Sequence, residues 1–182
     1  MIRVLHITNW FPSKGDKQAG IFVREQINAL APYCESETYH IQVRSQLGPL
    51  FRLVSSKLPE GGGAFIIETR ITTWKLIEWT NLVLLLCCLW RIRPRRFDVV
   101  NFHIAYPQLR FVRLIKKVVG RPIVITEHWS AYHYRFHIPE TSPKADKIKR
   151  IFRQRVPLIT VSKALMEDIR KFTGMNYQFP QF

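Results

Sequence analysis

Short runs of β-branched and aliphatic residues recur along the chain and are separated by stretches with helical periodicity. The first run, Ile2 to Thr8, leads into a loop marked by Pro12 and Gly15, which is the usual boundary of a strand. The strand candidates are residues 2–8, 39–43, 64–69, 97–102, 123–126 and 157–161. Residues 47–58 have an ambiguous pattern that favours neither a helix nor a strand.

Between the strand candidates, apolar residues recur at helical spacing. The core-facing stripes are Val23, Ile27 and Leu30; Phe111, Ile115 and Val118; and Ile148, Phe152 and Val156. Residues 74–91 also have helical length, but their central run is apolar on every side, which is typical of a helix inside a core or docked on another apolar surface. Alternating strands and helices predict one α/β domain with a mainly parallel sheet covered on both faces.

Composition narrows the partners and the compartment. The 182 residues include 28 Lys and Arg against 13 Asp and Glu, a formal charge of +15 that predicts attraction to nucleic acid, anionic lipid or a phosphorylated small molecule. Cys34, Cys87 and Cys88 are too few for a disulfide scaffold and lack the spacing of a zinc site, so we interpret them as reduced thiols of a cytoplasmic protein. The amino-terminal apolar run is too short for a signal peptide, and no segment reaches the roughly 18 apolar residues of a membrane-spanning helix.

The strand candidate at residues 123–126 runs directly into Glu127 and His128. Ligands of open α/β sheets bind at the carboxyl ends of the strands, so both side chains are candidates for a site. His128 can donate, accept or shuttle a proton near neutral pH, and Glu127 can orient it or a substrate hydroxyl. His103 ends the preceding strand and would lie beside His128 if the two strands are neighbours. The alternative is that these side chains are structural.

A metal site is another possible use of the histidines. His133 and His137 are four residues apart and would share a helix face, with His128 nearby. Pro139 and the density of aromatic residues argue against a regular helix there, and no metal site is predicted. Residues 129–143 break the periodicity and are instead a candidate for a functional loop or lid.

Glycine motifs that mark nucleotide sites are absent from the sequence. There is no Gly-x-Gly-x-x-Gly fingerprint and no Gly-Lys-Ser phosphate loop, which argues against a complete dinucleotide or nucleoside-triphosphate site, and no cofactor is predicted. Gly20, at the start of the first helix, can let backbone N–H groups approach a phosphate or a sugar hydroxyl. Ser162 lacks the flanking glycines of a nucleophile elbow and is interpreted as a helix cap.

Tryptophans occur next to a basic cluster. Trp74, Trp79 and Trp90 lie in the apolar helix candidate that precedes the cluster at residues 91–96. This combination suits contact with an anionic membrane surface better than base stacking, although a basic face can also simply be solvated. No nucleic-acid module is recognisable, so nucleic acid is not predicted as a partner.

Five segments that span nearly the whole chain resemble, in order, the amino-terminal half of a group 1 glycosyltransferase, which belongs to the retaining family 4 of the two-lobed GT-B class. They are Val4–Pro12 (VLHITNWFP), Gly20–Gln26 (GIFVREQ), Asp98–His103 (DVVNFH), Thr126–Ser130 (TEHWS) and Thr160–Leu165 (TVSKAL). Each match is modest alone, and their shared order makes the resemblance specific.

The resemblance implies a Rossmann-like three-layer α/β/α domain, one half of a GT-B fold, that shapes the acceptor site. It implies that His128 is catalytic and lies close to the transferred sugar, and that Gly20 approaches the donor diphosphate. The residues then expected to bind substrate are Glu127, His103, Trp129 and Ser130. The implied reaction is retaining and metal-independent, and it moves a sugar from a nucleotide-sugar donor to a glycan or lipid-linked acceptor during envelope polysaccharide synthesis.

In that family a second lobe follows and holds most contacts to the donor. We therefore expect residues 1–175 to form the acceptor-side domain, residues 176–182 to begin the linker, and the fragment alone to be inactive. The expected location is cytoplasmic, with peripheral contact to the inner face of the cell membrane. The rival hypothesis is a non-catalytic α/β module that binds a glycan or a partner, and a metal hydrolase is a third option.

Overall fold

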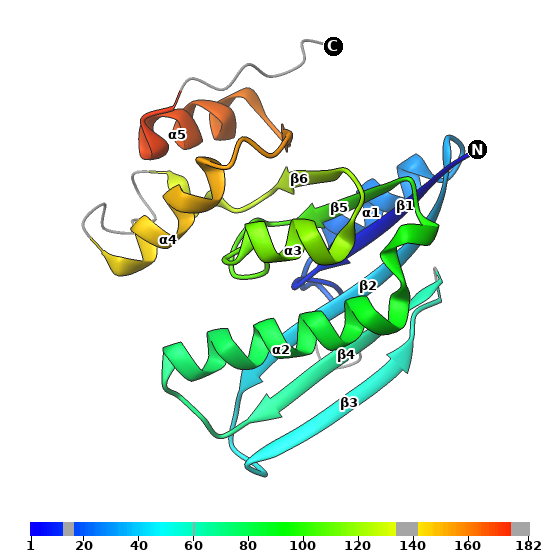
Figure 1. Ribbon diagram of the computed structural model, residues 1–182, viewed down its shortest axis with the longest axis vertical. Coiled ribbons are helices and arrows are strands. Elements are labelled where there is room, and N and C mark those ends of the chain that lie inside the picture. Colours follow the sequence, from blue (N-terminus) through cyan, green and yellow to red (C-terminus); the bar gives the residue numbers. More distant parts are fainter. Residues whose placement is uncertain (13–16, 60, 134–141, 176–182) are drawn as a thin grey trace.

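In the computed structural model, which describes residues 1–12, 17–59, 61–133 and 142–175, seven strands form one sheet with the order β3-β4-β2-β1-β5-β6-β7 (Figure 1). Neighbouring strands are parallel, except that β3 pairs antiparallel with β4. The strands are β1 (Ile2–Thr8), β2 (Cys34–Ser45), β3 (Phe51–Lys57), β4 (Gly62–Thr69), β5 (Val99–His103), β6 (Ile123–Glu127) and β7 (Leu158–Thr160). The predicted Rossmann-like α/β fold with a mainly parallel sheet is confirmed.

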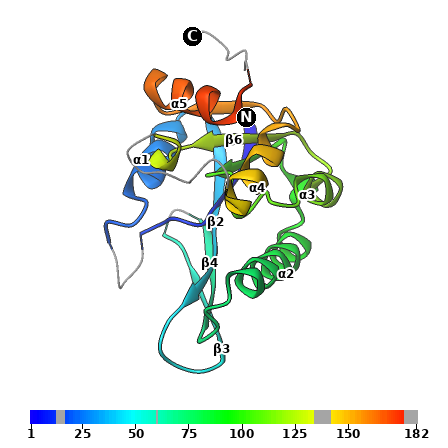
Figure 2. The same ribbon diagram turned by 90° about the vertical axis from the view of Figure 1, so that its left-hand side faces the viewer.

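Helices cover both faces of the sheet, as Figure 2 shows with the sheet seen on edge. The helices are α1 (Ile21–Leu30), α2 (Trp74–Ile92), α3 (Val112–Val119), α4 (Pro143–Phe152) and α5 (Lys163–Thr173), with short 3-10 turns η1 (Pro94–Arg96) and η2 (Ser130–Tyr132). α2, α3 and α4 lie on one face of the sheet, and α1 lies on the other. α5 is capped by Ser162, whose hydroxyl accepts a hydrogen bond from the backbone of Leu165, so the predicted cap is confirmed.

The two faces of the sheet differ in chemistry. Leu5, Ile7 and Phe102 are fully buried in the main apolar core, which packs against α2, α3 and α4. Side chains of a strand alternate between the two faces, so the residues between them point toward α1. The buried polar residues on the α1 side are His6, Thr8, Thr38, His40, Asn101, His103 and Thr126. One face is therefore apolar and the other carries a buried polar band.

Two strands differ from the sequence-based expectation. β3 occupies the stretch with the ambiguous pattern, because nearly all of its side chains are exposed and the strand lacks the alternation of a half-buried one. β2 begins at Cys34 rather than at Tyr39, because polar residues in its first half pair in register with β1. The other strand candidates are confirmed with small shifts at their ends.

Some predictions concern residues outside the described ranges. The loop or lid candidate at 129–143 contains η2 and the start of α4, whereas its residues 134–141, among them His137, are not described. The linker predicted at residues 176–182 is likewise outside these ranges and stays a prediction.

Candidate functional site

The carboxyl ends of β5 and β6 bring two of the predicted site residues together. The strands are adjacent, and the Nε2 atom of His128 lies 3.2 Å from the Nδ1 atom of His103. The ring of Phe22, in the first turn of α1, lies 4.9 Å from the ring of His128. The prediction that His103 lies beside His128 is confirmed, and the start of α1 belongs to the same edge of the sheet.

Burial keeps both imidazoles neutral near pH 7. It lowers the pKa of His128 to about 4 and holds the pKa of His103 well below its ordinary value, with further lowering from the neighbouring His6 and His128. Within the described part of the chain, the Nδ1 atom of His128 makes no hydrogen bond. A neutral imidazole with one unused nitrogen can accept a hydrogen bond from a ligand or donate one to it, depending on its tautomer.

Glu127 lies beneath this edge. Its buried carboxylate accepts hydrogen bonds from the backbone N–H groups of Ala105, His128 and Trp129 and from the hydroxyl of Tyr132, all at 3.0 Å. Burial raises the pKa of Glu127, and these hydrogen bonds oppose that shift. The carboxylate thus fixes the turns after β5 and β6 and binds the backbone of His128 rather than its ring. Direct contact of Glu127 with substrate stays a prediction.

Trp129 lines a pocket of about 270 Å³ at the carboxyl edge of the sheet. The pocket walls come from the loops after β1, β5 and β6, from the end of β2 and from the first turns of α2 and α4. Its aromatic members are Trp10, Trp74, Tyr106 and Trp129, and its polar members include Asn9, Gln42, Ser45 and Asn81. The Oδ1 atom of Asn9 is buried and has no hydrogen-bond partner among the described residues.

The amine of Lys144 lies among three of these rings. Its Nζ atom is 4.9 Å from the ring centre of Trp129, 5.4 Å from that of Trp74 and 5.6 Å from that of Tyr106, within the range of cation–π attraction. The indole N–H of Trp74 donates a hydrogen bond of 3.0 Å to the Tyr106 hydroxyl. Burial lowers the pKa of Lys144, and the charge of Glu78 opposes that shift. The pocket therefore combines flat apolar walls with one cation.

Glu78, on α2, binds the hydroxyl of Tyr106 beside this pocket. It is buried and accepts hydrogen bonds from the Tyr106 hydroxyl, from the Arg110 guanidinium and from the Lys147 amine. Burial raises the pKa of Glu78, but the hydrogen bonds from Lys147 and Tyr106 and the charge of Arg110 outweigh it and lower the pKa below its ordinary value. An ionised Glu78 thus holds Tyr106 in place at the pocket wall.

Gly20 is required by packing. Its backbone has a φ of 64°, and a Cβ atom there would lie 2.5 Å from the carbonyl carbon of Trp10. Only glycine lets α1 begin this close to the preceding backbone. The fold therefore accounts for Gly20 without a ligand, and its contact with a diphosphate stays a prediction. Ser130 is exposed at the start of η2, and its predicted contact with substrate also stays a prediction.

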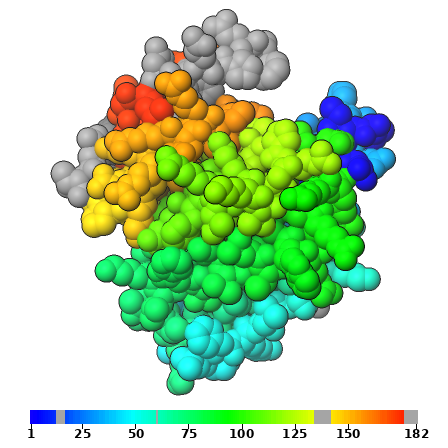
Figure 3. Space-filling model, in the orientation of Figure 1, coloured from blue at the N-terminus to red at the C-terminus, as the bar shows by residue number. Residues whose placement is uncertain are grey.

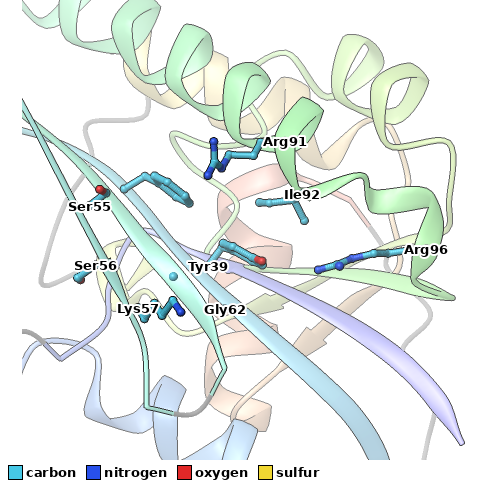
Figure 4. Close-up of a pocket in the computed structure, with 10 residues that line it drawn as sticks. Tyr39, Ser55, Ser56, Lys57, Gly62, Arg91, Ile92 and Arg96 are labelled. Carbon is cyan, nitrogen blue, oxygen red and sulfur yellow. The ribbon is translucent and has the colours of Figure 1, made fainter.

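A second hollow of about 540 Å³ lies at the amino-terminal end of β4, beside the last turn of α2 (Figure 4). Lys57, Arg91 and Arg96 line it, and Arg96 forms an ion pair with Glu37. None of its lining residues belongs to the predicted site. The aromatic pocket is therefore the hollow that coincides with the edge where ligands of α/β sheets bind.

The alternative metal site gains no support from the geometry. Over residues 1–12, 17–59, 61–133 and 142–175, no three His, Cys, Asp or Glu side chains converge closely enough to hold a metal ion. His128 and His133 fall within these ranges and His137 does not.

Comparisons with known proteins do not show a family for this chain. No protein-family model matches the sequence, and no curated protein matches it. A crystal structure of an alpha,alpha-trehalose-phosphate synthase (UDP-forming) from Burkholderia vietnamiensis is similar, with a TM-score of 0.41 and 14% sequence identity. The similarity covers 95% of this chain and 38% of that chain, so this chain spans well under half the length of that protein. A similarity of this size carries no argument about function.

Several residues that shape the aromatic pocket and the surroundings of His128 were not predicted from the sequence. Lys144 belongs to a basic amphipathic helix and looks like one more solvated cation, while Tyr106 and Glu78 are far apart in the sequence and come together only through the fold. His6 and Thr8 alternate with the apolar residues of β1, as in an ordinary half-buried strand. That alternation, together with Asn101 and His103 on β5, was the signal for a buried polar face.

Proposed function

We propose that this chain is the acceptor-binding domain of a retaining glycosyltransferase that moves a sugar from a nucleotide-sugar donor to a glycan or lipid-linked acceptor in envelope polysaccharide synthesis. The observation that carries the proposal is the pocket of Trp74, Tyr106 and Trp129 at the carboxyl edge of the sheet. The C–H faces of a sugar ring stack on aromatic rings, and its hydroxyls need polar partners in the same site. The pocket provides both.

Two polar groups of the pocket fit sugar hydroxyls. The side chain of Asn9 lines the pocket, and its amide can donate to a sugar hydroxyl or accept from one. The amine of Lys144 is a donor that already lies over the aromatic walls, so an oxygen of a stacked sugar would meet it. The same amine also suits an acceptor that carries a carboxylate or a phosphate.

The donor side of the proposed reaction involves His128. In the proposed mechanism the donor phosphate helps to deprotonate the acceptor without a metal ion, and preorganised groups stabilise the developing charge. His128 lies beside Phe22, close in sequence to Gly20, so the proposed contacts to the transferred sugar and to the diphosphate share one side of the sheet edge. A second lobe would supply most of the contacts to the nucleotide.

A surface on α2 supports a peripheral location at an anionic membrane. One side of this helix packs against the core. The opposite side exposes large apolar residues at helical spacing, and they are Leu76, Trp79, Val83 and Trp90. Trp90 is 83% exposed. The neighbouring α3 exposes Arg113, Lys116 and Lys117, and both helices lie on the face seen in Figure 3. Among the described helices, none is both long and apolar enough to cross a membrane.

Binding measurements on matched tryptophan variants test the proposed function. We expect Trp129→Ala to weaken the binding of a short glycan acceptor about tenfold, because one aromatic wall is lost. Trp90→Ala, which removes an exposed tryptophan outside the pocket, serves as the control and should leave the affinity unchanged. Equal affinity in all three proteins would contradict the assignment of the pocket.

Calorimetry with nucleotide sugars tests the division of the site between two lobes. We expect weak binding to this chain alone, since most donor contacts are proposed to lie elsewhere. Tight, stoichiometric binding of a nucleotide sugar to the chain would contradict that division.

A further inference from the structure

Three histidines, of which His6 and His103 are buried and His128 is half-buried, form a hydrogen-bonded row across adjacent strands on the α1 face of the sheet. The Nδ1 atom of His6 lies 3.0 Å from the Nε2 atom of His103, whose own Nδ1 atom lies 3.2 Å from the Nε2 atom of His128. At the far end, the Oγ atom of Ser36 lies 3.3 Å from the Nε2 atom of His6. The row therefore runs from β2 through β1 and β5 to the unused nitrogen of His128 after β6.

Each imidazole in this row is neutral near pH 7. Burial lowers the pKa of His6 and of His128 to about 4, and burial with two neighbouring imidazoles holds the pKa of His103 well below its ordinary value. A neutral imidazole has one N–H group, so it donates from one nitrogen and accepts at the other.

The geometry of the links couples the three tautomers. Both links join an Nδ1 atom to an Nε2 atom of the next ring, so each link is made only when the two rings carry their proton on the same type of nitrogen. Two arrangements satisfy both links at once, with the proton on Nδ1 of all three rings or on Nε2 of all three. Any mixture makes two lone pairs or two N–H groups face each other.

Asn101 lies beside the hydrogen bond between His6 and His103 and favours neutral imidazoles there. Its Nδ2 atom lies 3.5 Å from the Nδ1 atom of His6 and 3.4 Å from the Nε2 atom of His103. The Thr126 hydroxyl donates to the Oδ1 atom of Asn101 at 3.0 Å, which directs the amide N–H₂ toward the histidines. In either arrangement one of these two ring nitrogens carries a lone pair, and the amide N–H₂ group of Asn101 faces it. The same N–H₂ group disfavours protons on both nitrogens at once.

We propose that His6 and His103 are positioning residues that couple the tautomer of His128 to the distant hydrogen bond between His6 and Ser36, so that a change at Ser36 alters whether the Nδ1 atom of His128 presents a proton or a lone pair. With protons on every Nδ1, His128 donates a hydrogen bond to an anionic oxygen, and with protons on every Nε2, it accepts one from a sugar hydroxyl. The role of this proton position on His128 in sugar transfer rests on the proposed function. The coupling of the three tautomers does not depend on that function.

Nitrogen-15 NMR of the imidazole rings in the wild-type chain tests the coupling directly, since protonated and bare ring nitrogens resonate in separate regions. We expect His6, His103 and His128 to carry their proton on the same type of nitrogen. A mixed set of tautomers would overturn the proposal. The measurement needs no sugar and no turnover, so its failure would leave the proposed function standing, and a failure of sugar binding would leave the coupling standing.

A remote substitution provides the second test. Ser36→Ala removes the end of the row two imidazoles away from His128, and we expect the tautomer ratio of His128 to change about fivefold, the effect of one hydrogen bond. Thr38→Val is the matched control, because it removes a buried hydroxyl from the same face of β2 that has no hydrogen-bond partner among the described residues. A folded Ser36→Ala protein with the wild-type ratio would overturn the action at a distance. If Ser36→Ala does not fold, the wild-type spectrum alone decides.

Discussion

The Nζ atom of Lys144 lies 4.9 Å from the ring centre of Trp129, so the first turn of α4 and the loop after β6 meet across the aromatic pocket. The lysine occupies the place where an oxygen on a stacked ring would be recognised. Its position also explains why a basic residue of an amphipathic helix is drawn away from solvent, since three aromatic faces compensate for part of its lost hydration.

Removing the charge of Lys144 tests this role. We expect Lys144→Met, which keeps most of the aliphatic stem, to weaken the binding of a glycan acceptor about tenfold, because a charge-assisted hydrogen bond is lost. Lys149→Met is the control on the same helix, since the Lys149 amine lies over Phe172 rather than over the pocket. Unchanged affinity of the Lys144→Met protein by calorimetry would remove Lys144 from the binding site.

A pair of glycine substitutions separates packing from backbone strain. Gly20 and Gly174 both have φ values in the left-handed region, 64° and 67°, but a Cβ atom at Gly174 would meet no atom of the described residues within 4 Å. We expect Gly174→Ala to lower the free energy of unfolding by about 1 kcal/mol, the cost of the backbone conformation alone. Gly20→Ala should cost at least about 3 kcal/mol because of the added overlap with Trp10. Equal losses in urea unfolding would refute the close approach.

Glu127 is predicted to be a major contributor to stability. Glu127→Gln keeps the shape of the side chain but makes an amide N–H₂ group face N–H and O–H donors, so we expect a loss of about 3 kcal/mol in the free energy of unfolding. Tyr132→Phe removes only one of the hydrogen bonds to this carboxylate and should cost about 1 kcal/mol. A Glu127→Gln protein as stable as the wild type would show that the carboxylate does not hold the turns.

The buried histidines predict a specific sensitivity to acid. Burial lowers the pKa of His6 and of His40 to about 4 in the folded protein, whereas the unfolded chain takes up the same protons near pH 6.5. Stability is therefore unaffected above pH 6.5 and falls as the pH drops from 6.5 toward 4, by up to about 3 kcal/mol for each histidine. His40→Phe should abolish its share, which is measured by urea unfolding at pH 7 and pH 4. The same acid loss in the variant would contradict the assignment.

Membrane contact through α2 and α3 is predicted to depend on salt and on Trp90. We expect the protein to sediment with vesicles that contain anionic lipid, to be released as the salt concentration rises, and to bind neutral vesicles less. Trp90→Ser should weaken the binding, while Trp129→Ser, in the pocket, should not. Equal recovery with neutral and anionic vesicles would argue against the electrostatic part of this contact.

The sequence predicts the fold well because the strands and helices alternate and most strands carry a strong β-branched signal. It does not predict β3, because an exposed edge strand lacks an apolar face, and it does not define the first half of β2, where the polar residues Ser36 and Glu37 interrupt the pattern. These segments are strands because neighbouring strands supply the hydrogen-bond partners.

The candidate site, like the fold, is predicted from the sequence where the signal is local and is not predicted where it depends on contacts between distant segments. Strand ends are visible in the sequence, so Trp129 and the neighbourhood of His103 and His128 could be predicted. Lys144 lies at the aromatic pocket and His6 lies beside His103, but both come from distant segments of the sequence. The patterns of these segments are those of a solvated helix and an ordinary strand. Only the sheet order and the packing of α4 reveal what they contact.

The most direct measurement is an NMR titration of the chain with a short glycan acceptor, with the indole N–H resonances of its tryptophans as reporters. We expect the resonances of Trp74 and Trp129, which line the pocket, to move together with increasing glycan, while that of the exposed Trp90 stays in place. Shifts at Trp90 without shifts at Trp74 and Trp129, or no shifts at saturating glycan, would contradict the claim that this pocket binds the acceptor.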